Sequence, residues 1–515
     1  MPQGRTRRTV RIISRSLAAE ASLSLNTLSS RHSRPGGGEP EDLKLHRAQN
    51  FRRTLEELGP LYVKVGQILA TRPDFVPQHI RDELENLNDR ASVEPFSTFE
   101  PVLKQDLGPN WRAHFTEIST GQPLGAASLA QAYKAVHADG RTCVIKVQRP
   151  NATEAVLGDM SVLRTVTRLM TKAAPHFNEV VDIRAMLEVL FTVMEAELDF
   201  TREARNMKDA RKAARDFTRI RVPKVITATP RVLVQTFAEG NPINRVKPDE
   251  LSKKQRKEIS YQLIQFMFRC YFLERKFHAD PHPGNIIVSP DGKAHLIDWG
   301  MVGKLDRSTS TALLGTFLAM AHNDGTSMAR QWVNLGTPTP WSNLSAFVGD
   351  LTRIVPYWSD ATLAELNLGV ALMSMLRYSS RRGVQITPLV SVVGKSVANI
   401  EGSVRYLYPK LKLSTALRTT LKDIMRDLLL DTFTEEQGAQ AALHLLSVAT
   451  QSPAQLQAFL TDLSVGQLTL QARTNLGDPI KAGWRHRNAG RSGIVPAAAA
   501  GVAFGWGRRR TRRKP

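Results

Sequence analysis

The sequence is poor in cysteine, because its 515 residues include only Cys143 and Cys270. At most one disulfide bond can form, which excludes a small scaffold held together by several disulfides. No apolar run reaches the ~18–20 residues that a helix needs to cross a bilayer unaided. Hydrophobic residues at 42% and charged residues at 23% are typical of a globular protein. The length allows one large catalytic unit or two to three domains.

Aromatic residues are also few, at 7%, and offer no platform for stacked bases. The net charge of +22 is concentrated at the chain ends: residues 1–34 contribute +6 and residues 481–515 contribute +10. The body of the chain is therefore almost balanced in charge. We expect the tails to bind an anionic lipid surface, and no nucleic acid is expected as a partner.

Two questions about the tails stay open. Residues 492–506 form a short, weakly apolar segment before a basic cluster, and they fit either an anchor at the membrane surface or a disordered tail. Residues 1–34 are rich in Arg and Ser, which also suits an organellar transit peptide. We expect a bacterial protein on the cytoplasmic face of the membrane, peripheral or anchored at its C-terminus, or an organellar protein if the N-terminal segment is a transit peptide.

The hydrophobic period changes several times along the chain. Apolar spacing of three and four residues predicts helices over 40–107, 152–215, 250–277 and from 305 to about 475. Alternating residues around Gly turns predict two β-hairpins, over 131–147 and 285–297, and strand-like runs over 222–235.

The strongest chemical signal lies in two short segments, Phe-His-Ala-Asp-Pro-His-Pro-Gly-Asn at 277–285 and Leu-Ile-Asp-Trp-Gly at 296–300. An Asp with an Asn five residues on, a hairpin, and a second Asp in Asp-x-Gly is the arrangement that phosphoryl transfer uses. Asp280 can orient or deprotonate an acceptor, while Asn285 and Asp298 can bind Mg²⁺ on nucleotide phosphates. Either Asp alone would more simply shape a turn, but the joint pattern favours catalysis.

A kinase-like site also needs a cation for the phosphates. Lys146 lies among apolar residues on the second strand of the first hairpin, where the phosphate-binding lysine of kinases lies. A candidate phosphate loop precedes it, formed by Gly125, Ala126, Ala127 and Ser128. The acidic partner of Lys146 is expected on the helical stretch 190–207, which carries Glu195, Glu197, Asp199 and Glu203.

These residues resemble the UbiB/AarF family of atypical kinase-like proteins. The family's Lys-x-Gly-Gln motif matches residues 64–67, its Ala-rich loop matches 125–128, its Glu-x-Asp motif matches 197–199, and its catalytic loop matches 278–285. The resemblance runs from about residue 45 to 410. A helical stretch with Lys395, Glu401 and Gly402 also resembles the family, and we expect a packing role there.

The resemblance implies a role for each matching residue. Lys146 would bind phosphate with Glu203 as its partner on a helix, although which of Glu197 and Glu203 pairs with Lys146 stays open. The remaining expected roles are Lys64 and Gln67 facing the nucleotide cleft, Glu197 and Asp199 holding Lys64, His278 bracing the loop, Asp280 as the catalytic aspartate, and Asn285 and Asp298 as metal ligands.

The implied fold is α+β and bilobal, like a protein kinase, with a family-specific helical extension at the N-terminus and a mostly helical C-terminal part. The expected segments are a basic disordered segment at 1–40, the helical extension at 41–120, an N-lobe at 121–240, a C-lobe at 241–410, C-terminal helices at 411–480 and a basic, weakly apolar tail at 481–515.

The sequence also departs from an ordinary protein kinase. No Ala-Pro-Glu segment or activation loop follows Gly300, and position 282 is His where protein kinases commonly have Lys. We therefore expect an atypical kinase or ATPase with ATP and Mg²⁺ as cofactors. The family resemblance, together with the basic tails, implies association with a membrane and support of isoprenoid quinone or other lipid metabolism. Anionic or isoprenoid lipid is an expected partner, and a homodimer is one option.

Two alternatives remain. The first is a pseudokinase scaffold that binds nucleotide and lipid without phosphoryl transfer. The second is a small-molecule phosphotransferase of the aminoglycoside type, which leaves the motif of Lys64 and Gln67 unexplained.

Overall fold

The computed structural model describes residues 12, 41–70, 72, 76–87, 92–173, 183–359, 368–411, 420, 421, 423, 424, 426 and 427. The chain divides into two compact units, Met1–Ile424 and Met425–Pro515, and the elements below belong to the first. Helices alternate with mainly antiparallel sheets, so the predicted α+β class is confirmed. The expected tail at 481–515, nearly all of 1–40 and most of 411–480 lie outside the described residues, and the expected domain boundaries stay predictions.

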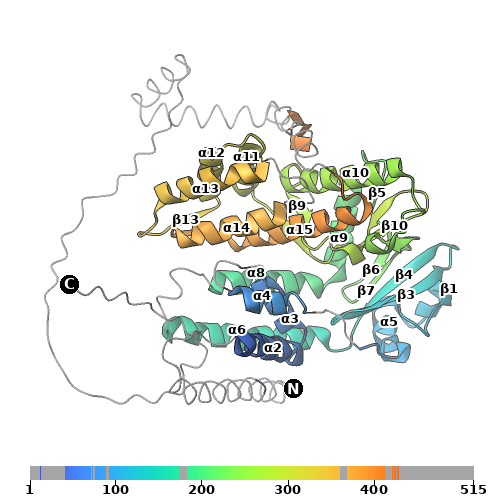
Figure 1. Cartoon of the computed structure of the whole chain (residues 1–515). Coiled ribbons are helices and arrows are strands. Elements are labelled where there is room, and N and C mark those ends of the chain that lie inside the picture. Colours follow the sequence, from blue (N-terminus) through green and yellow to red (C-terminus); the bar gives the residue numbers. More distant parts are fainter. Residues whose placement is uncertain are drawn as a thin grey trace, which may run out of the picture. The chain divides into compact units, whose positions relative to one another are not determined.

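Three N-terminal helices share a core with two later ones (Figure 1). Helix α3 (Pro60–Ala70) contacts both α6 (Ala152–Ala173) and α8 (Ile183–Glu197). The other two N-terminal helices are α2 (Glu41–Leu58) and α4 (Gln78–Leu84). Each of these helices turns an apolar face to the core, where Leu55 of α2, Leu61 of α3 and Leu84 of α4 are buried.

The first predicted hairpin forms the centre of a six-stranded sheet with the order β1-β3-β4-β7-β6, and β2 pairs with β3. The strands are β1 (Phe115–Ile118), β2 (Gly125–Ala126), β3 (Ala130–His137), β4 (Thr142–Gln148), β6 (Val225–Ala228) and β7 (Val232–Thr236). On β4, Cys143, Ile145 and Val147 are fully buried in the core of this sheet. Because side chains alternate along a strand, Lys146 points to the opposite face.

Several elements link this sheet to the rest of the first unit. Helix α5 (Glu100–Leu107) contacts β4 and β7. Helix α9 (Phe200–Ala213) contacts β6 and β7. Short 3-10 turns are η1 (Phe96–Thr98), η2 (Trp111–His114), η3 (Ile243–Arg245) and η4 (Pro283–Asn285).

The second predicted hairpin is also confirmed, as β10 (Ile286–Val288) paired with β11 (Ala294–Leu296). It lies in a four-stranded sheet with β5 (Ile220–Arg221) and β8 (Asn241–Pro242). The helix predicted over 250–277 is α10 (Lys253–Phe272), which ends earlier than expected. The chain then turns through Arg275, whose φ is 52°, and the following residues form β9 (Lys276–His278) against β12 (Val302–Lys304).

The C-terminal part of the first unit is helical, as predicted, apart from one small sheet. The pair β13 (Gly336–Pro338) and β14 (Val384–Ile386) was not expected. The helices are α11 (Arg307–Ala321), α12 (Gly325–Val333), α13 (Leu344–Ser359), α14 (Leu368–Arg381) and α15 (Pro388–Leu407). None of the helices in the described ranges combines the length and apolar character that a membrane crossing requires.

The start of α14 lies directly against α15. A Cβ on Gly369 would lie 2.4 Å from the Ala398 Cβ and 2.5 Å from its Cα, so only glycine permits this approach. The Gly369 N–H donates to Glu401 Oε2 at 3.4 Å, and burial raises the pKa of Glu401 to about 7. By contrast, a Cβ on Gly402 of α15 would meet open space.

We expect Gly369→Ala to lower the free energy of unfolding by about 1–3 kcal/mol, because the added methyl group must push two helices apart. Gly402→Ala is the matched control, and it should raise the free energy by up to about 1 kcal/mol because alanine favours a helix. Urea denaturation of both variants measures the difference. Equal effects of the two substitutions would show that the α14–α15 approach is not tight.

Candidate functional site

Lys146 and Glu203 form an ion pair between the sheet and a helix. Lys146 Nζ lies 2.9 Å from Glu203 Oε2 and 3.1 Å from Oε1. Glu203, in the first turn of α9, is only 2% exposed. Burial opposes the charge of Lys146, but the carboxylates of Asp298 and Glu203 outweigh it and raise the pKa of Lys146 above its ordinary value. The ammonium group is therefore charged at any physiological pH.

Asp298 lies beside this pair. Its Oδ2 is 3.6 Å from Lys146 Nζ, and its Oδ1 accepts the Gly300 N–H at 3.0 Å. Burial would raise the pKa of Asp298, but the Lys146 ammonium and the Gly300 N–H hold it well below its usual value. The carboxylate is ionised and ready to bind a cation.

Trp299 connects Asp298 to α9. Its backbone N–H donates to Glu203 Oε1 at 3.3 Å, and its carbonyl accepts from Asn206 Nδ2 at 3.0 Å. The indole is 2% exposed and its N–H donates to the Leu296 carbonyl at 3.1 Å. The bulky side chain therefore fixes the Asp-x-Gly segment against the helix that carries Glu203.

Asp280 is held by the last described long helix, α15. Asp280 Oδ1 accepts from Asn399 Nδ2 at 2.6 Å and lies 3.6 Å from Lys395 Nζ. Burial would raise the pKa of Asp280, but Lys395 and then Lys64 lower it below its usual value. The Asn285 Nδ2 donates to the Asp280 carbonyl at 3.3 Å, which ties the two motif residues together.

His278 braces the loop from inside the protein, the role expected for it. Its side chain is buried, and its Nδ1 accepts the Asp280 N–H at 3.2 Å. Burial lowers the pKa of His278 to about 4, so the ring is neutral at physiological pH. Its ring centroid lies 4.9 Å from that of Trp299.

Lys64 reaches this cluster from α3 in the N-terminal helices. Its Nζ lies 3.3 Å from Glu197 Oε1 and 3.7 Å from the sulfur of Met301, next to the Asp-x-Gly segment. Lys64 also contributes to the lowered pKa values of Asp280 and Asp298. The open question about the two glutamates is answered by these contacts: Glu203 pairs with Lys146 and Glu197 with Lys64.

The glycine of the Lys-x-Gly-Gln motif has a packing reason. A Cβ on Gly66 would lie 2.3 Å from Leu87 Cδ1 and 2.7 Å from Leu55 Cδ1. The next residue, Gln67, donates through Nε2 to the Leu87 carbonyl at 3.4 Å. Gly66 and Gln67 therefore fix α3 against the segment after α4.

Asp199 has a different role from the expected one of holding Lys64. It is the N-cap of α9, and its Oδ1 accepts the Thr201 N–H at 2.9 Å and the Thr201 hydroxyl at 2.6 Å. An Asp at this position satisfies backbone donors that a helix start leaves unpaired. It acts on the site by fixing the first turn of α9, where Glu203 lies.

The candidate phosphate loop lies at an edge of the sheet. It consists of Gly125 and Ala126, which form β2, followed by Ala127 and Ser128. Gly125 pairs with Ala132, and Ala132 pairs with Lys146 on the next strand. The loop thus lies two strands from the Lys146 backbone, about 10 Å by ordinary strand spacing.

Arg149, which the sequence did not indicate, supports this loop. Its Nε donates to the Ala127 carbonyl at 3.0 Å, and its guanidinium pairs with Glu94. An arginine just after a strand can make many different contacts, so no local sequence pattern predicts that Arg149 binds the loop.

The residues that could hold Mg²⁺ fit a hard cation. Asp298 offers a carboxylate, and Asn285, whose NH₂ group faces the Asp280 carbonyl, offers its amide oxygen. Among the described residues there is no cluster of three or more His, Cys, Asp or Glu side chains that could hold a metal. One carboxylate and one amide oxygen suit Mg²⁺, which uses one or two carboxylates and completes its shell with water and phosphate oxygens.

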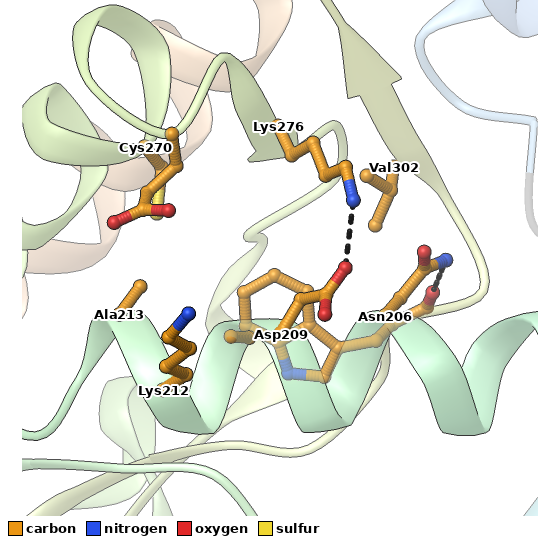
Figure 2. Close-up of a pocket in the computed structure, with 10 residues that line it drawn as sticks. Asn206, Asp209, Lys212, Ala213, Cys270, Lys276 and Val302 are labelled. Carbon is orange, nitrogen blue, oxygen red and sulfur yellow. Dashed lines mark hydrogen bonds and ion pairs between the residues drawn. The ribbon is translucent and has the colours of Figure 1, made fainter.

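A separate cavity of about 230 Å³ lies between α9 and the segment of α10 and β9. Figure 2 shows Lys276 pointing to Asp209 across this cavity, at 2.7 Å between Nζ and Oδ2. Trp299 and Cys270 also line it, whereas Lys146, Glu203, Asp280 and Asp298 do not. Cys270 is a free cysteine, as is Cys143 in the sheet.

The chain is similar to several known proteins. A family model described as the ABC1 atypical kinase-like domain matches residues 86–332. The chain is 31% identical over 396 residues to a protein named probable protein kinase UbiB from Xylella fastidiosa, covering 75% of this chain and 71% of that one. It is 32% identical over 390 residues to an uncharacterized chloroplastic aarF domain-containing protein kinase of Arabidopsis thaliana, covering 75% of this chain and 54% of that one. Among solved structures, a Mycobacterium tuberculosis protein in complex with erythromycin matches 72% of this chain and 97% of its own, at 24% identity and a TM-score of 0.48.

We expect strong coupling between Lys146 and Glu203 in a double-mutant cycle. Lys146→Met leaves a buried Glu203 carboxyl without its cation, and Glu203→Gln removes the charge from the other side. The double variant should lose less free energy of unfolding than the sum of the single variants, by about 1–3 kcal/mol.

The exposed pair of Lys276 and Asp209 is the control for this cycle. Its side chains are 47% and 54% exposed, so the coupling in Lys276→Met and Asp209→Asn should stay below about 1 kcal/mol. Urea denaturation gives all the free energies. Additive losses at Lys146 and Glu203 would contradict the ion pair.

Proposed function

The chain belongs to the ABC1 atypical kinase-like family, and on that premise we propose that it is a magnesium-dependent ATPase or phosphotransferase. The observation that carries the proposal is the grouping of Lys146, Glu203 and Asp298 within ion-pair distance, with Asp280 held nearby by its own cation. A cation for phosphates, a carboxylate for a metal and a second carboxylate for the acceptor are the parts that phosphoryl transfer requires.

The protein's residues would divide the work as follows. Lys146, kept charged and oriented by Glu203, binds nucleotide phosphates. Asp280 accepts a hydrogen bond from the acceptor and orients it for attack. Asn285 and Asp298 hold Mg²⁺, which neutralises charge on the phosphates when it is bound.

The acceptor in this proposal is water or a small molecule. After Gly300 the chain enters β12 and then α11, which begins at Arg307, so no long segment follows the Asp-x-Gly sequence. Protein kinases use such a segment to bind a peptide. Its absence here supports an acceptor that needs no extended docking platform.

A nucleotide-binding pseudokinase scaffold is the second candidate, and the position of Lys64 favours it. Lys64 is 8% exposed and lies against Glu197 and Met301. Its charge also acts on Asp280 and Asp298, the carboxylates that would face a metal–nucleotide complex. A chain in this state would bind nucleotide with little turnover.

Asp298→Asn separates the two candidates. We expect it to lower Mg²⁺-dependent ADP release by at least about 10²-fold, because the metal loses its carboxylate ligand. Asp249→Asn, a change at an exposed loop residue, should leave the rate unchanged. Steady-state ADP release at saturating ATP is the measurement, and equal rates in wild type and Asp298→Asn would favour the scaffold.

We also propose that the protein acts at a membrane in isoprenoid quinone or other lipid metabolism. The tail at 481–515 carries eight Arg and two Lys and no acid, which supports attraction to an anionic leaflet. The family relationship supports the lipid link, since the Xylella relative carries the UbiB name.

We expect the full chain to bind vesicles of phosphatidylcholine containing anionic phosphatidylglycerol and to release them at high salt. Replacing the ten cationic residues of 481–515 by Gln should lower the vesicle affinity by at least about 10²-fold. Vesicle co-sedimentation measures both, with pure phosphatidylcholine vesicles as the control. Unchanged binding of the substituted chain would contradict a role for this tail.

A further inference from the structure

The catalytic loop lacks a cation of its own next to Asp280. The residue two positions after Asp280 is His282, and its Nδ1 accepts the Gly284 N–H at 3.0 Å, so this ring stabilises the turn of its own loop. Protein kinases commonly have a lysine at this position, and this loop has none. Nothing else within residues 278–285 carries a permanent positive charge.

Helix α15 brings such a cation to the same place from a distant part of the sequence. Lys395 Nζ lies 3.6 Å from Asp280 Oδ1, and Asn399, one turn later, donates to the same oxygen at 2.6 Å. Both contacts fall on Oδ1. In the proposed reaction, Oδ2 would be the oxygen that receives the acceptor.

Other side chains on the same face of α15 also form hydrogen bonds to the loop. The Ser396 hydroxyl donates to the His278 carbonyl at 2.6 Å, and the Ser403 hydroxyl donates to the Pro281 carbonyl at 3.2 Å. Residues three and four apart share one face of a helix, so these contacts and that of Asn399 fix the height and rotation of Lys395 relative to Asp280. Beyond the packing role expected for it, Lys395 therefore contacts the Asp280 carboxylate.

The pair of Lys395 and Asp280 is partly exposed. The Lys395 side chain is 26% exposed and that of Asp280 is 21% exposed, so solvent reaches both side chains. Charge balance is consistent with a further cation here. The carboxylates on Glu197, Glu203, Asp280 and Asp298 outnumber the ammonium groups of Lys64 and Lys146 by two, which the proposed Mg²⁺ would offset, and a triphosphate adds negative charge that Lys395 would help to offset.

We propose that Lys395 is a catalytic residue whose ammonium group binds the transferred phosphoryl group beside Asp280, in place of the lysine that the loop lacks. This inference rests on the proposed function. In the step, the acceptor oxygen forms a bond to the terminal phosphorus of ATP while its proton passes to Asp280, and the bond from that phosphorus to the bridging oxygen breaks, leaving its electron pair on ADP. Lys395 stabilises the oxygens of the phosphoryl group as their charge shifts.

Lys395→Met in the full chain tests the proposal. We expect kcat for Mg²⁺-dependent ATP hydrolysis to fall by about 10²-fold, since the lost cation acts mainly in the transition state. The KM for ATP should change by less than about threefold, because Lys146 and Mg²⁺ supply most of the ground-state binding. Lys395→Arg keeps the charge and should recover at least about tenfold of the lost kcat.

Lys410→Met is the matched control, because Lys410 is an exposed lysine just beyond α15. It should leave kcat and KM at the wild-type values. The thermal unfolding temperature of every variant shows whether the fold is retained. A Lys395→Met chain that is too unstable to assay is replaced by Lys395→Gln, which keeps a hydrogen-bond donor beside Asp280.

The outcomes are distinct. An active wild type with kcat unchanged in Lys395→Met overturns the proposal and leaves the proposed function standing. Equal losses of kcat and of stability in Lys395→Met and Lys395→Arg also overturn it, since they assign Lys395 a structural role. A wild type without Mg²⁺-dependent hydrolysis refutes the proposed function, and this inference with it.

Discussion

The ion pair between Lys146 and Glu203 is the interaction on which the rest of the site depends. It joins a strand of the sheet to α9 and holds a buried carboxylate that would be costly without its cation. Glu203 in turn accepts the N–H of Trp299, so one carboxylate holds both Lys146 and the Asp-x-Gly segment. Lys146 Nζ and the Trp299 N–H both contact Glu203 Oε1, so a single oxygen atom links β4 to that segment.

Two helices from outside the segment matched by the family model complete the site. The match covers residues 86–332, whereas Lys64 on α3 and Lys395 on α15 lie before and after it. Both contribute positive charge that keeps Asp280 ionised. The kinase-like segment supplies the loop and the residues proposed to bind the metal, and the flanking helices set their electrostatic environment.

Much of this arrangement could be predicted from sequence, because the motifs carry their own local context. The two hairpins, and the placement of Lys146 on a strand, follow from alternating residues around short turns. The role of Lys395 could not be predicted, since it depends on packing between α15 and a loop more than a hundred positions away. Asp199 was misjudged although the signal was available, because Asp just before a helix start is a preferred N-cap. The turn between α10 and β9 includes Arg275 in left-handed geometry, and a non-glycine residue gives no sequence signal for that conformation.

The dependence of the catalytic loop on α15 has a consequence for biosynthesis. Asp280 precedes Asn399 by 119 positions, so a ribosome adding about 5–20 residues each second makes the loop roughly 6–24 seconds before its supporting helix. During that interval the growing polypeptide has the aspartate but lacks the groups that orient it. Completion of the site therefore awaits the emergence of a late helix from the exit tunnel.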